Sequence, residues 1–340
     1  MRYEIPKLET LESLNFAKKL NELQINNPFT FSANMKWVRP FGMLFAAIAI
    51  KQFRRKYEHI PFSIECNTIT DGISYAAHMG FFKSISERIN IGKMPGEAFG
   101  NDNYIPISEL DLNQIHKKEI ENGKPLIIGN AIENESSRLA KILGRDNKEL
   151  NILLTYLIRE MLRNISEHSG CNKAWFCGQY WSDGMAEIAI IDEGIGIKNS
   201  LQKNDIHRNY VETDKDALEY SIKAGISKAF HPAIKNKSNN PWDNSGFGLY
   251  MASEICKELD GSFCLATGSK YIYIYNNGKT RISDTSLQGT AVKITISTNE
   301  IFNSQAIISK IAKQGEEQAK AIRFAFKEAS VPSKGLIIGL

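Results

Sequence analysis

Three polar side chains stand at a regular spacing in the segment from 149 to 169, which reads ELNILLTYLIREMLRNISEHS. Glu160, Asn164 and His168 follow one another at intervals of four residues, so on a helix they form one stripe. A carboxylate can polarise a water molecule, an amide oxygen suits Mg²⁺, and an imidazole can face phosphate. This order of groups predicts a site for a water molecule, a metal ion and a phosphate.

The element that carries this stripe is predicted to be an amphipathic helix. The segment has no proline and no internal glycine, and its leucines and isoleucines recur three and four residues apart. The stripe runs along the edge of the apolar face, where three polar groups would be half buried. The alternative is a solvated helix edge on which Glu160 pairs with Arg159 or Arg163, and this helix by itself leaves both interpretations open.

A second candidate group stands at the end of a predicted strand, 185–192, which is followed by EGIGIKNS. The Asp192 carboxylate can accept a hydrogen bond from an exocyclic amine such as that of adenine. Gly194 and Gly196 allow the backbone to pass close under a flat base, and Ile197 completes the D-x-G-x-G-I pattern. Many strand-to-turn junctions without a ligand share this pattern, so it is a weak signal when taken alone.

A glycine-rich turn opens the predicted helix at 249–259. Such a turn presents free backbone N–H groups and the positive end of the helix dipole, which suit phosphate. A flexible helix start is the alternative. Thr290 opens the last predicted strand, 290–297, where its hydroxyl could lie near the base. The phosphate-contacting candidates are Ser245, Gly246, Phe247, Gly248 and Leu249.

The polar stretch from 199 to 245 carries one predicted helix, at 216–223, and is typical of a lid next to a ligand site. No G-x-x-x-x-G-K-[ST] motif and no G-x-G-x-x-G motif opening a helix after a strand is present, which argues against the P-loop and dinucleotide-binding folds. Candidate strands at 173–181, 262–267 and 271–275 complete a sheet around the motifs.

Composition places the chain among ordinary soluble proteins. It has 340 residues, of which 42% are hydrophobic and 24% charged, with a formal net charge of +4, so nucleic acid is not indicated. The basic run KQFRRK at 51–56 follows an apolar segment and is predicted to be the solvated end of a helix. Its five cysteines show no CxxC spacing, and no signal peptide or membrane-length apolar run occurs, which predicts a cytoplasmic protein without zinc or disulfides.

The ordered set of motifs resembles the GHKL superfamily, the ATP-binding domain shared by DNA gyrase, the large heat-shock chaperone, histidine kinases and the mismatch-repair ATPase. The set runs ExxxNxxxH, D-x-G-x-G-I, G-x-G-L and G-T over residues 146–299. The stretch LIREMLRNISEHS is similar to the bacterial kinase form of the first motif. The resemblance implies a mixed sheet with helices on one face.

By position, the resemblance assigns Asn164 to Mg²⁺, Asp192 to the adenine amine, and Glu160 to general-base catalysis. Gly194 and Gly196 would line the base, and Gly246 and Gly248 would meet the phosphates of ATP. The upstream histidines lack the surroundings of a phosphoacceptor, which argues against a two-component kinase.

The region from 29 to 110 resembles the STAS domain of anti-sigma-factor antagonists, on the stretches FTFSANMKWVRPFGMLFAAI and YAAHMGFF. In that family a phosphorylatable Ser or Thr precedes the first long helix, whereas the turn here is Arg39-Pro40-Phe41-Gly42. We therefore expect no phosphorylation switch at this turn.

The whole chain is predicted to be an α/β (α+β) protein. An N-terminal helical segment (1–28) precedes the STAS-like domain (29–110), connecting helices (111–145), the GHKL domain (146–299) and a helical tail (300–340). We expect an ATPase or nucleotide-dependent switch with slow, Glu160-dependent hydrolysis; the alternatives are an anti-sigma-type Ser/Thr kinase and a non-catalytic ATP-responsive module. A protein partner would bind through the STAS-like half or the tail, and the tail could also form a homodimer contact.

Overall fold

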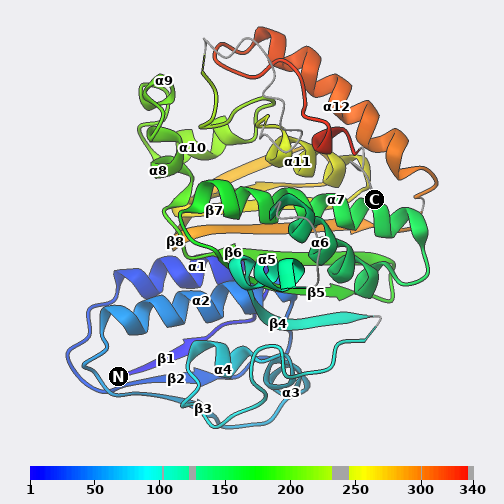
Figure 1. Ribbon diagram of the computed structural model, residues 1–340. Coiled ribbons are helices and arrows are strands. Elements are labelled where there is room, and N and C mark those ends of the chain that lie inside the picture. The colour runs from blue at the N-terminus through cyan, green and yellow to red at the C-terminus, as the bar shows by residue number, and fades with distance from the viewer. Residues whose placement is uncertain (102, 122–127, 232–244, 300, 336–340) are drawn as a thin grey trace.

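The structure, a computed structural model, describes residues 1–101, 103–121, 128–231, 245–299 and 301–335. It is a mixed α/β protein, with a parallel three-stranded sheet in the N-terminal part and an antiparallel five-stranded sheet after it, each with its helices (Figure 1). Among the described residues, no helix is long and apolar enough to cross a membrane.

The N-terminal sheet has the order β1-β2-β3, with both pairings parallel. Its first strand lies within the segment at 1–28, for which only a helix was predicted. The sequence did not reveal this strand because four residues with one buried side chain give almost no periodic signal. The other elements of this part continue as strands and helices in turn. The strands are β1 (Arg2–Ile5), β2 (Phe29–Ala33) and β3 (Phe62–Cys66), and the helices are α1 (Thr10–Glu22), α2 (Pro40–Lys56), α3 (Asp71–His78) and α4 (Phe81–Ile85).

The second sheet begins with β4 (Tyr104–Asp111), which pairs antiparallel with β5 (Lys173–Tyr180). The five strands have the order β4-β5-β6-β8-β7, with β6 (Met185–Asp192), β7 (Ser262–Ile274) and β8 (Thr280–Ser297).

All four pairings of this sheet are antiparallel, so the prediction of a mixed sheet was wrong. The chain returns directly after β5 and after β7, and such short connections can join only antiparallel neighbours. The two strands expected at 262–267 and 271–275 are one strand, β7, whose register with β8 shifts near Gly268.

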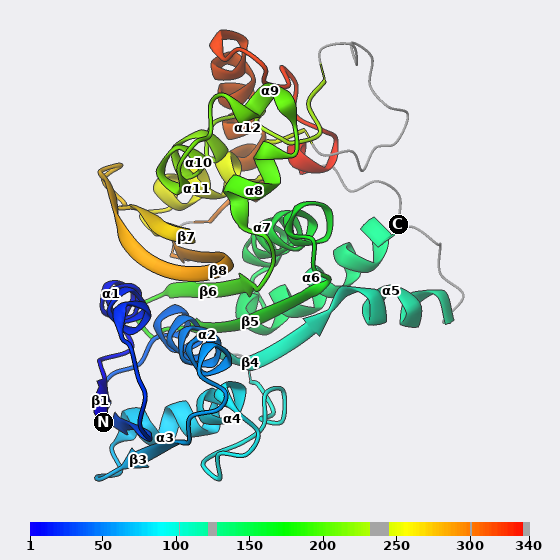
Figure 2. The same cartoon turned by 90° about the vertical axis from the view of Figure 1, so that its left-hand side faces the viewer.

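Helices cover both faces of the five-stranded sheet, which corrects the prediction of helices on one face. Figure 2 shows α1 and α2 between the two sheets, so the same helices pack on the N-terminal sheet and on the second one. One apolar cluster joins α2 residues such as Phe45 to Ala189 and Ile191 of β6. Along β6 the next residues, Ile188 and Ile190, point into the opposite cluster, so this strand is buried on both faces.

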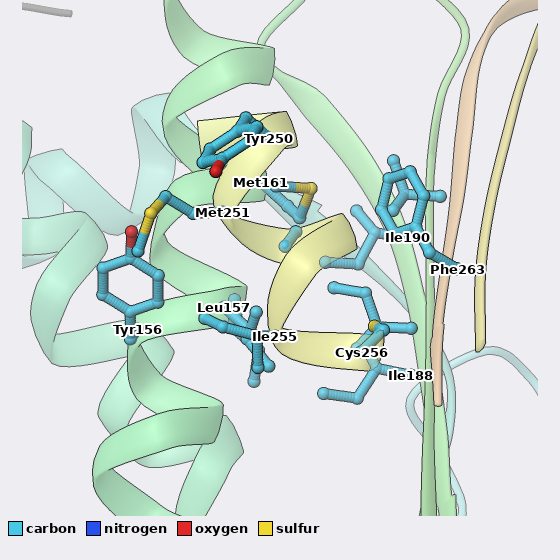
Figure 3. Packing of buried hydrophobic residues seen from close by; sticks show 14 of the residues in the cluster. Tyr156, Leu157, Met161, Ile188, Ile190, Tyr250, Met251, Ile255, Cys256 and Phe263 are labelled. Atoms are coloured by element: carbon cyan, nitrogen blue, oxygen red, sulfur yellow. The ribbon is translucent and has the colours of Figure 1, made fainter. Parts of the chain in front are cut away.

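The opposite face is covered by α7 (Lys148–Asn164) and α11 (Gly248–Glu258), with α6 (Ile128–Gly144) beside α7 and α12 (Ser304–Ala321) outside them. Figure 3 shows Leu157 of α7 beside Ile255 of α11, both on the side of the helices that faces Ile188 and Ile190 of the sheet. Burying each such side chain contributes about 1.5–3 kcal/mol. The apolar face predicted for α7 therefore fixes its stripe against the sheet. The remaining connecting helix, α5 (Leu112–Glu121), lies beside α6.

The predicted lid is more structured than the polar loop that its composition suggested. It contains α8 (Gly196–Gln202), α9 (Asp205–Arg208) and α10 (Asp214–Ser221), and residues 232–244 lie outside the described part. Buried side chains such as Val211 and Leu218 hold these helices on the sheet. The tail expected to be helical ends in a short turn, η2 (Pro332–Lys334).

Candidate functional site

The chain leaves α7 through a π-helical turn, η1 (Ile165–Ser169), rather than through a further α-helical turn. Single π turns are rare and occur often at functional sites. This one is tied to the loop after β6, because the Ile195 N–H donates to the Ser169 carbonyl oxygen at 2.8 Å. His168 therefore lies on a wider turn than the regular stripe predicted.

A cavity of about 90 Å³ lies between α7, η1, β6, α8, α11 and β8. Most of the residues singled out from the sequence line it, although they come from four separate segments. They are Asn164, His168, Asp192, Gly196, Ile197, Gly246, Gly248, Leu249 and Thr290. Glu160, Gly194, Ser245 and Phe247 do not line the cavity.

Asp192 is the buried carboxylate of the cavity and is only 4% exposed. Its Oδ1 accepts a hydrogen bond from the Gly194 N–H at 2.9 Å, and Thr290, its partner in the β6–β8 register, also donates to it. Burial raises the pKa of Asp192 to about 6, against the opposing effect of these hydrogen bonds. An ionised carboxylate in this setting would gain from a donor supplied by a ligand.

Thr267 fixes the backbone around Asp192. Its hydroxyl donates to the Gly289 carbonyl oxygen at 2.9 Å and accepts from the Ile197 N–H at 3.1 Å. A Cβ on Gly196, which has φ of +75°, would lie 2.8 Å from that hydroxyl. Gly196 must therefore be glycine, both for its backbone conformation and for this close approach.

Gly194 has a different role from the expected one. A Cβ there would lie 2.3 Å from the Ser169 carbonyl oxygen, so this glycine allows the loop to pack on η1. Gly194 therefore holds the loop after β6 against η1 and does not line the cavity.

The glycines at the start of α11 also make close contacts. A Cβ on Gly248 would lie 2.9 Å from Glu160 Oε2 and 3.5 Å from Asn164 Nδ2, and one on Gly246 would lie 2.5 Å from the Ile226 carbonyl oxygen. The helix N-terminus can therefore approach the cavity without a side chain in the way.

Two residues of the same motif face elsewhere. Phe247 is fully buried and packs against the ring of Tyr250 with 6.4 Å between centroids, so it belongs to the core. The Ser245 hydroxyl accepts a hydrogen bond from the Ser330 N–H at 2.9 Å, which joins this loop to the C-terminal segment.

Glu160 is buried beside the cavity and is 4% exposed. Its Oε1 lies 3.5 Å from Arg159 Nη2 and 3.6 Å from Arg163 Nη1, and its Oε2 accepts from the Ser333 hydroxyl at 3.4 Å. The pairing with arginine that the sequence left open is present, but in the interior and not in solvent. The Ser333 hydroxyl thus brings the C-terminal segment into contact with Glu160, against which the start of α11 also packs.

Asn164 and His168 both reach the cavity. The Asn164 amide nitrogen is buried, and within the described part of the chain it has no hydrogen-bond partner. Burial lowers the pKa of His168 to about 3, and the nearby positive charge of Lys228 contributes a smaller part of this effect. The imidazole is therefore neutral near pH 7. His168 could meet a phosphate as a neutral donor, but not as the cation that would bind it best.

The cavity also has residues that the sequence analysis missed, above all Ser227 and Lys228 after α10. The Lys228 ammonium donates to the Glu167 carbonyl oxygen, and burial, then Lys203, lowers its pKa. A lysine in a polar stretch carries no recognisable pattern, so its place in the cavity could come only from the fold.

The described residues contain no group of three or more His, Cys, Asp or Glu side chains that could hold a metal ion. Neither a comparison with models of known protein families nor one with curated protein sequences finds a match for this chain.

Proposed function

We propose that this protein binds ATP together with Mg²⁺ and uses the bound nucleotide as a regulatory switch, as the resemblance to the GHKL superfamily implies. The observation that carries the proposal is the convergence of four separate segments on one cavity. They bring a buried carboxylate, a glycine-rich helix start and an amide to the same space. Convergence of this kind is expected of a binding site and not of unrelated turn motifs.

The residues present fit such a ligand. Asp192 would accept the adenine amine, while Gly196 and Ile197 would lie against the base. The backbone at Gly246 and Gly248 would meet phosphate at the positive end of α11, with Lys228 as a nearby cation. The unpartnered amide of Asn164 would gain a partner, and a rotation of that amide would present its oxygen to the metal.

Bound Mg²⁺ would neutralise phosphate charge, and such ions are usually held by one or two carboxylates together with phosphates and water. Here the amide oxygen of Asn164 would take the place of a carboxylate. The remaining binding would come from the chain's own amides and from Lys228.

The surroundings of Glu160 support a switch over an enzyme that turns over continuously. A general base must reach the water or hydroxyl whose proton it takes. Glu160 is held by Arg159, Arg163 and the Ser333 hydroxyl, so hydrolysis, or transfer to a partner's hydroxyl, would require these contacts to rearrange.

A protein partner would read the nucleotide state through the N-terminal half. Trp37 is 70% exposed and Ile69 is 80% exposed, and both lie in the loops after β2 and β3. These loops touch, because the Thr70 hydroxyl donates to the Met35 carbonyl oxygen. Because the two exposed apolar side chains lie on loops that touch, we propose this part of the surface as the partner contact.

The proposal is tested by titrating the purified protein with ATP and Mg²⁺ in a calorimeter. Asp192→Asn should weaken binding at least about tenfold, because a charged acceptor is lost. Asp205→Asn is the matched control, since Asp205 is exposed and pairs with Arg208 away from the cavity. Absence of ATP binding by the unmodified protein would show that the proposal is wrong.

A further inference from the structure

The loop that carries Asp192 is held from the N-terminal half by α2. Glu193 directly follows Asp192, and Lys51 Nζ donates to its Oε1 at 2.7 Å. The Trp175 indole N–H donates to the same oxygen at 3.3 Å, and Arg55 donates to Oε2. The side chains of Lys51 and Glu193 are 20% and 15% exposed, so this pair is largely withdrawn from water.

The next residue of α2 holds the neighbouring strand. The Gln52 side chain donates to the Gln288 carbonyl oxygen and accepts from the Gln288 N–H, each at 2.9 Å. Gln288 precedes Gly289, where a Cβ would lie 1.9 Å from the Asp192 carbonyl oxygen. The amide of Gln52 therefore fixes the segment that packs directly on Asp192.

These contacts differ from the solvated helix end predicted for the basic run at 51–56. Adjacent residues of α2 grip the end of β6 through Glu193 and the β8 backbone through Gln288. Those two strands carry Asp192 and Thr290, the polar groups at the base end of the proposed site. Lys51 and Gln52, which make these contacts, lie in the N-terminal half, whereas Asp192 and Thr290 lie in the second sheet.

We propose that Lys51, Gln52 and Glu193 are positioning residues, which hold Asp192 and Thr290 in the arrangement that recognises the base. The N-terminal half is then a structural part of the nucleotide site and not only a separate binding module. This inference rests on the proposed function, because it concerns the same cavity. The clamp acts through Asp192 and Thr290, because its own three side chains do not line the cavity.

The charges of the clamp are only partly solvated, so removing one of them should change the position of the loop that carries Asp192. Removing Lys51 leaves Glu193 with Arg55 and the Trp175 indole as its remaining donors, and neutralising Glu193 leaves both cations without their carboxylate. Either change unbalances charge in a site poor in water, so we expect the loop to shift. Such a shift would disturb the base end of the site more than the phosphate end, which is built from α7 and α11. Selectivity for adenine over guanine should therefore change more than phosphate binding does.

The test compares Lys51→Met, Glu193→Gln and the double variant in titrations with ATP and with GTP, both with Mg²⁺. Each single change should lower the ratio of ATP to GTP affinity about tenfold, which corresponds to 1.4 kcal/mol. The double variant should lower this ratio no further than the single variant with the larger effect does, because the two residues act as a unit. Lys56→Met is the control, since Lys56 belongs to the same run but lies over the Tyr57 ring.

Hydrogen exchange of the backbone amides at 192–197, measured without nucleotide, tests the clamp separately. Exchange should be faster in Lys51→Met than in Lys56→Met, with far-UV circular dichroism showing that both are folded. Equal exchange in the two variants would overturn the inference. An unchanged affinity ratio, in a protein that does bind ATP, would overturn it while leaving the proposed function intact; no ATP binding by the unmodified protein would remove the proposed function and the inference together.

Discussion

At the scale of single residues, the proposed recognition of the base depends on the protonation state of Asp192. Burial holds its pKa near 6, above the ordinary value of 3.8, so the folded protein retains this proton between about pH 4 and 6. Its contribution to stability is therefore full below pH 3.8 and is lost as the pH rises through 6. An amine donor from a ligand would compensate for the ionised form.

This titration predicts the pH dependence of binding. ATP affinity should fall as the pH drops from 7 to 5, with a midpoint near 6, because protonated Asp192 loses an acceptor. Asp192→Asn should lack this fall in affinity. Any change that remains in the variant would come from the ionisation of ATP, which affects both proteins equally. Calorimetry across this range gives the measurement, and parallel pH profiles for the two proteins would contradict the role of Asp192.

Gly248 supplies a second test at this scale. In Gly248→Ala the added methyl would lie 2.9 Å from Glu160 Oε2 and would border the cavity, so nucleotide affinity should fall about tenfold or more. The control is Gly278→Ala in the β7–β8 turn, where a Cβ meets nothing within 4 Å. That change should cost some stability through its positive φ but leave affinity unaltered. Equal affinities for both variants would argue against phosphate at the α11 N-terminus.

At the scale of elements, the C-terminal segment determines the surroundings of Glu160. Arg159 Nη2 donates to the Pro332 carbonyl oxygen at 2.5 Å, and the Tyr156 hydroxyl donates to the Ser333 carbonyl oxygen at 3.0 Å. With Ser330 bound to Ser245, these contacts attach the segment to both α7 and the glycine loop. Its removal would open a path for water to Glu160.

Deleting residues 330–340 should therefore raise ATP turnover several-fold above that of the protein without the deletion, and Glu160→Ala in the shortened protein should abolish the increase. Phosphate release gives the rate. Thermal unfolding serves as the control, because the lost contacts should lower the melting temperature by only a few degrees. Turnover that stays unchanged in a folded, ATP-binding deletion variant would contradict a covering role for this segment.

The sequence predicted long periodic elements well and their surroundings poorly. The leucine spacing of α7 predicted this helix correctly, since the signal is local. By contrast, Ala186 to Ile191 is almost continuously apolar around Glu187, a pattern that indicates burial on both faces, and yet helices were expected on one face only. The extra helices of the lid were missed because short amphipathic segments give little periodicity.

The candidate site divides in the same way. Motif residues with a backbone role, such as Gly196 and Gly248, could be identified from type and position. Lys228, Ser227 and the α2 clamp could not, because they approach the cavity from distant parts of the chain. Neither could the enclosure of Glu160, which depends on how the tail folds back over α7.

At the scale of the whole molecule, the two halves share one apolar cluster through α1 and α2. Glu187 of β6 adds a polar link, since its Oε1 accepts from the Phe41 N–H at the start of α2 at 3.0 Å. Both halves are therefore expected to unfold together, although the sequence suggested a chain of separate domains.

The molecule should consequently show one thermal transition by circular dichroism and by tryptophan fluorescence, and ATP with Mg²⁺ should shift the whole transition. At a free concentration one hundred times the dissociation constant, the expected stabilisation is about 2.7 kcal/mol. ATP without Mg²⁺ serves as a weaker ligand for comparison. Two transitions, of which nucleotide moves only one, would show that the halves are not coupled.

The most direct test of the nucleotide site is a crystal structure with a non-hydrolysable ATP analogue and Mg²⁺. If ATP and Mg²⁺ bind as proposed, the adenine amine will lie within hydrogen-bonding distance of Asp192, the phosphates at the backbone of Gly246 and Gly248, and the metal on the Asn164 oxygen. An analogue bound elsewhere, or a cavity that excludes it at saturating concentration, would contradict the account.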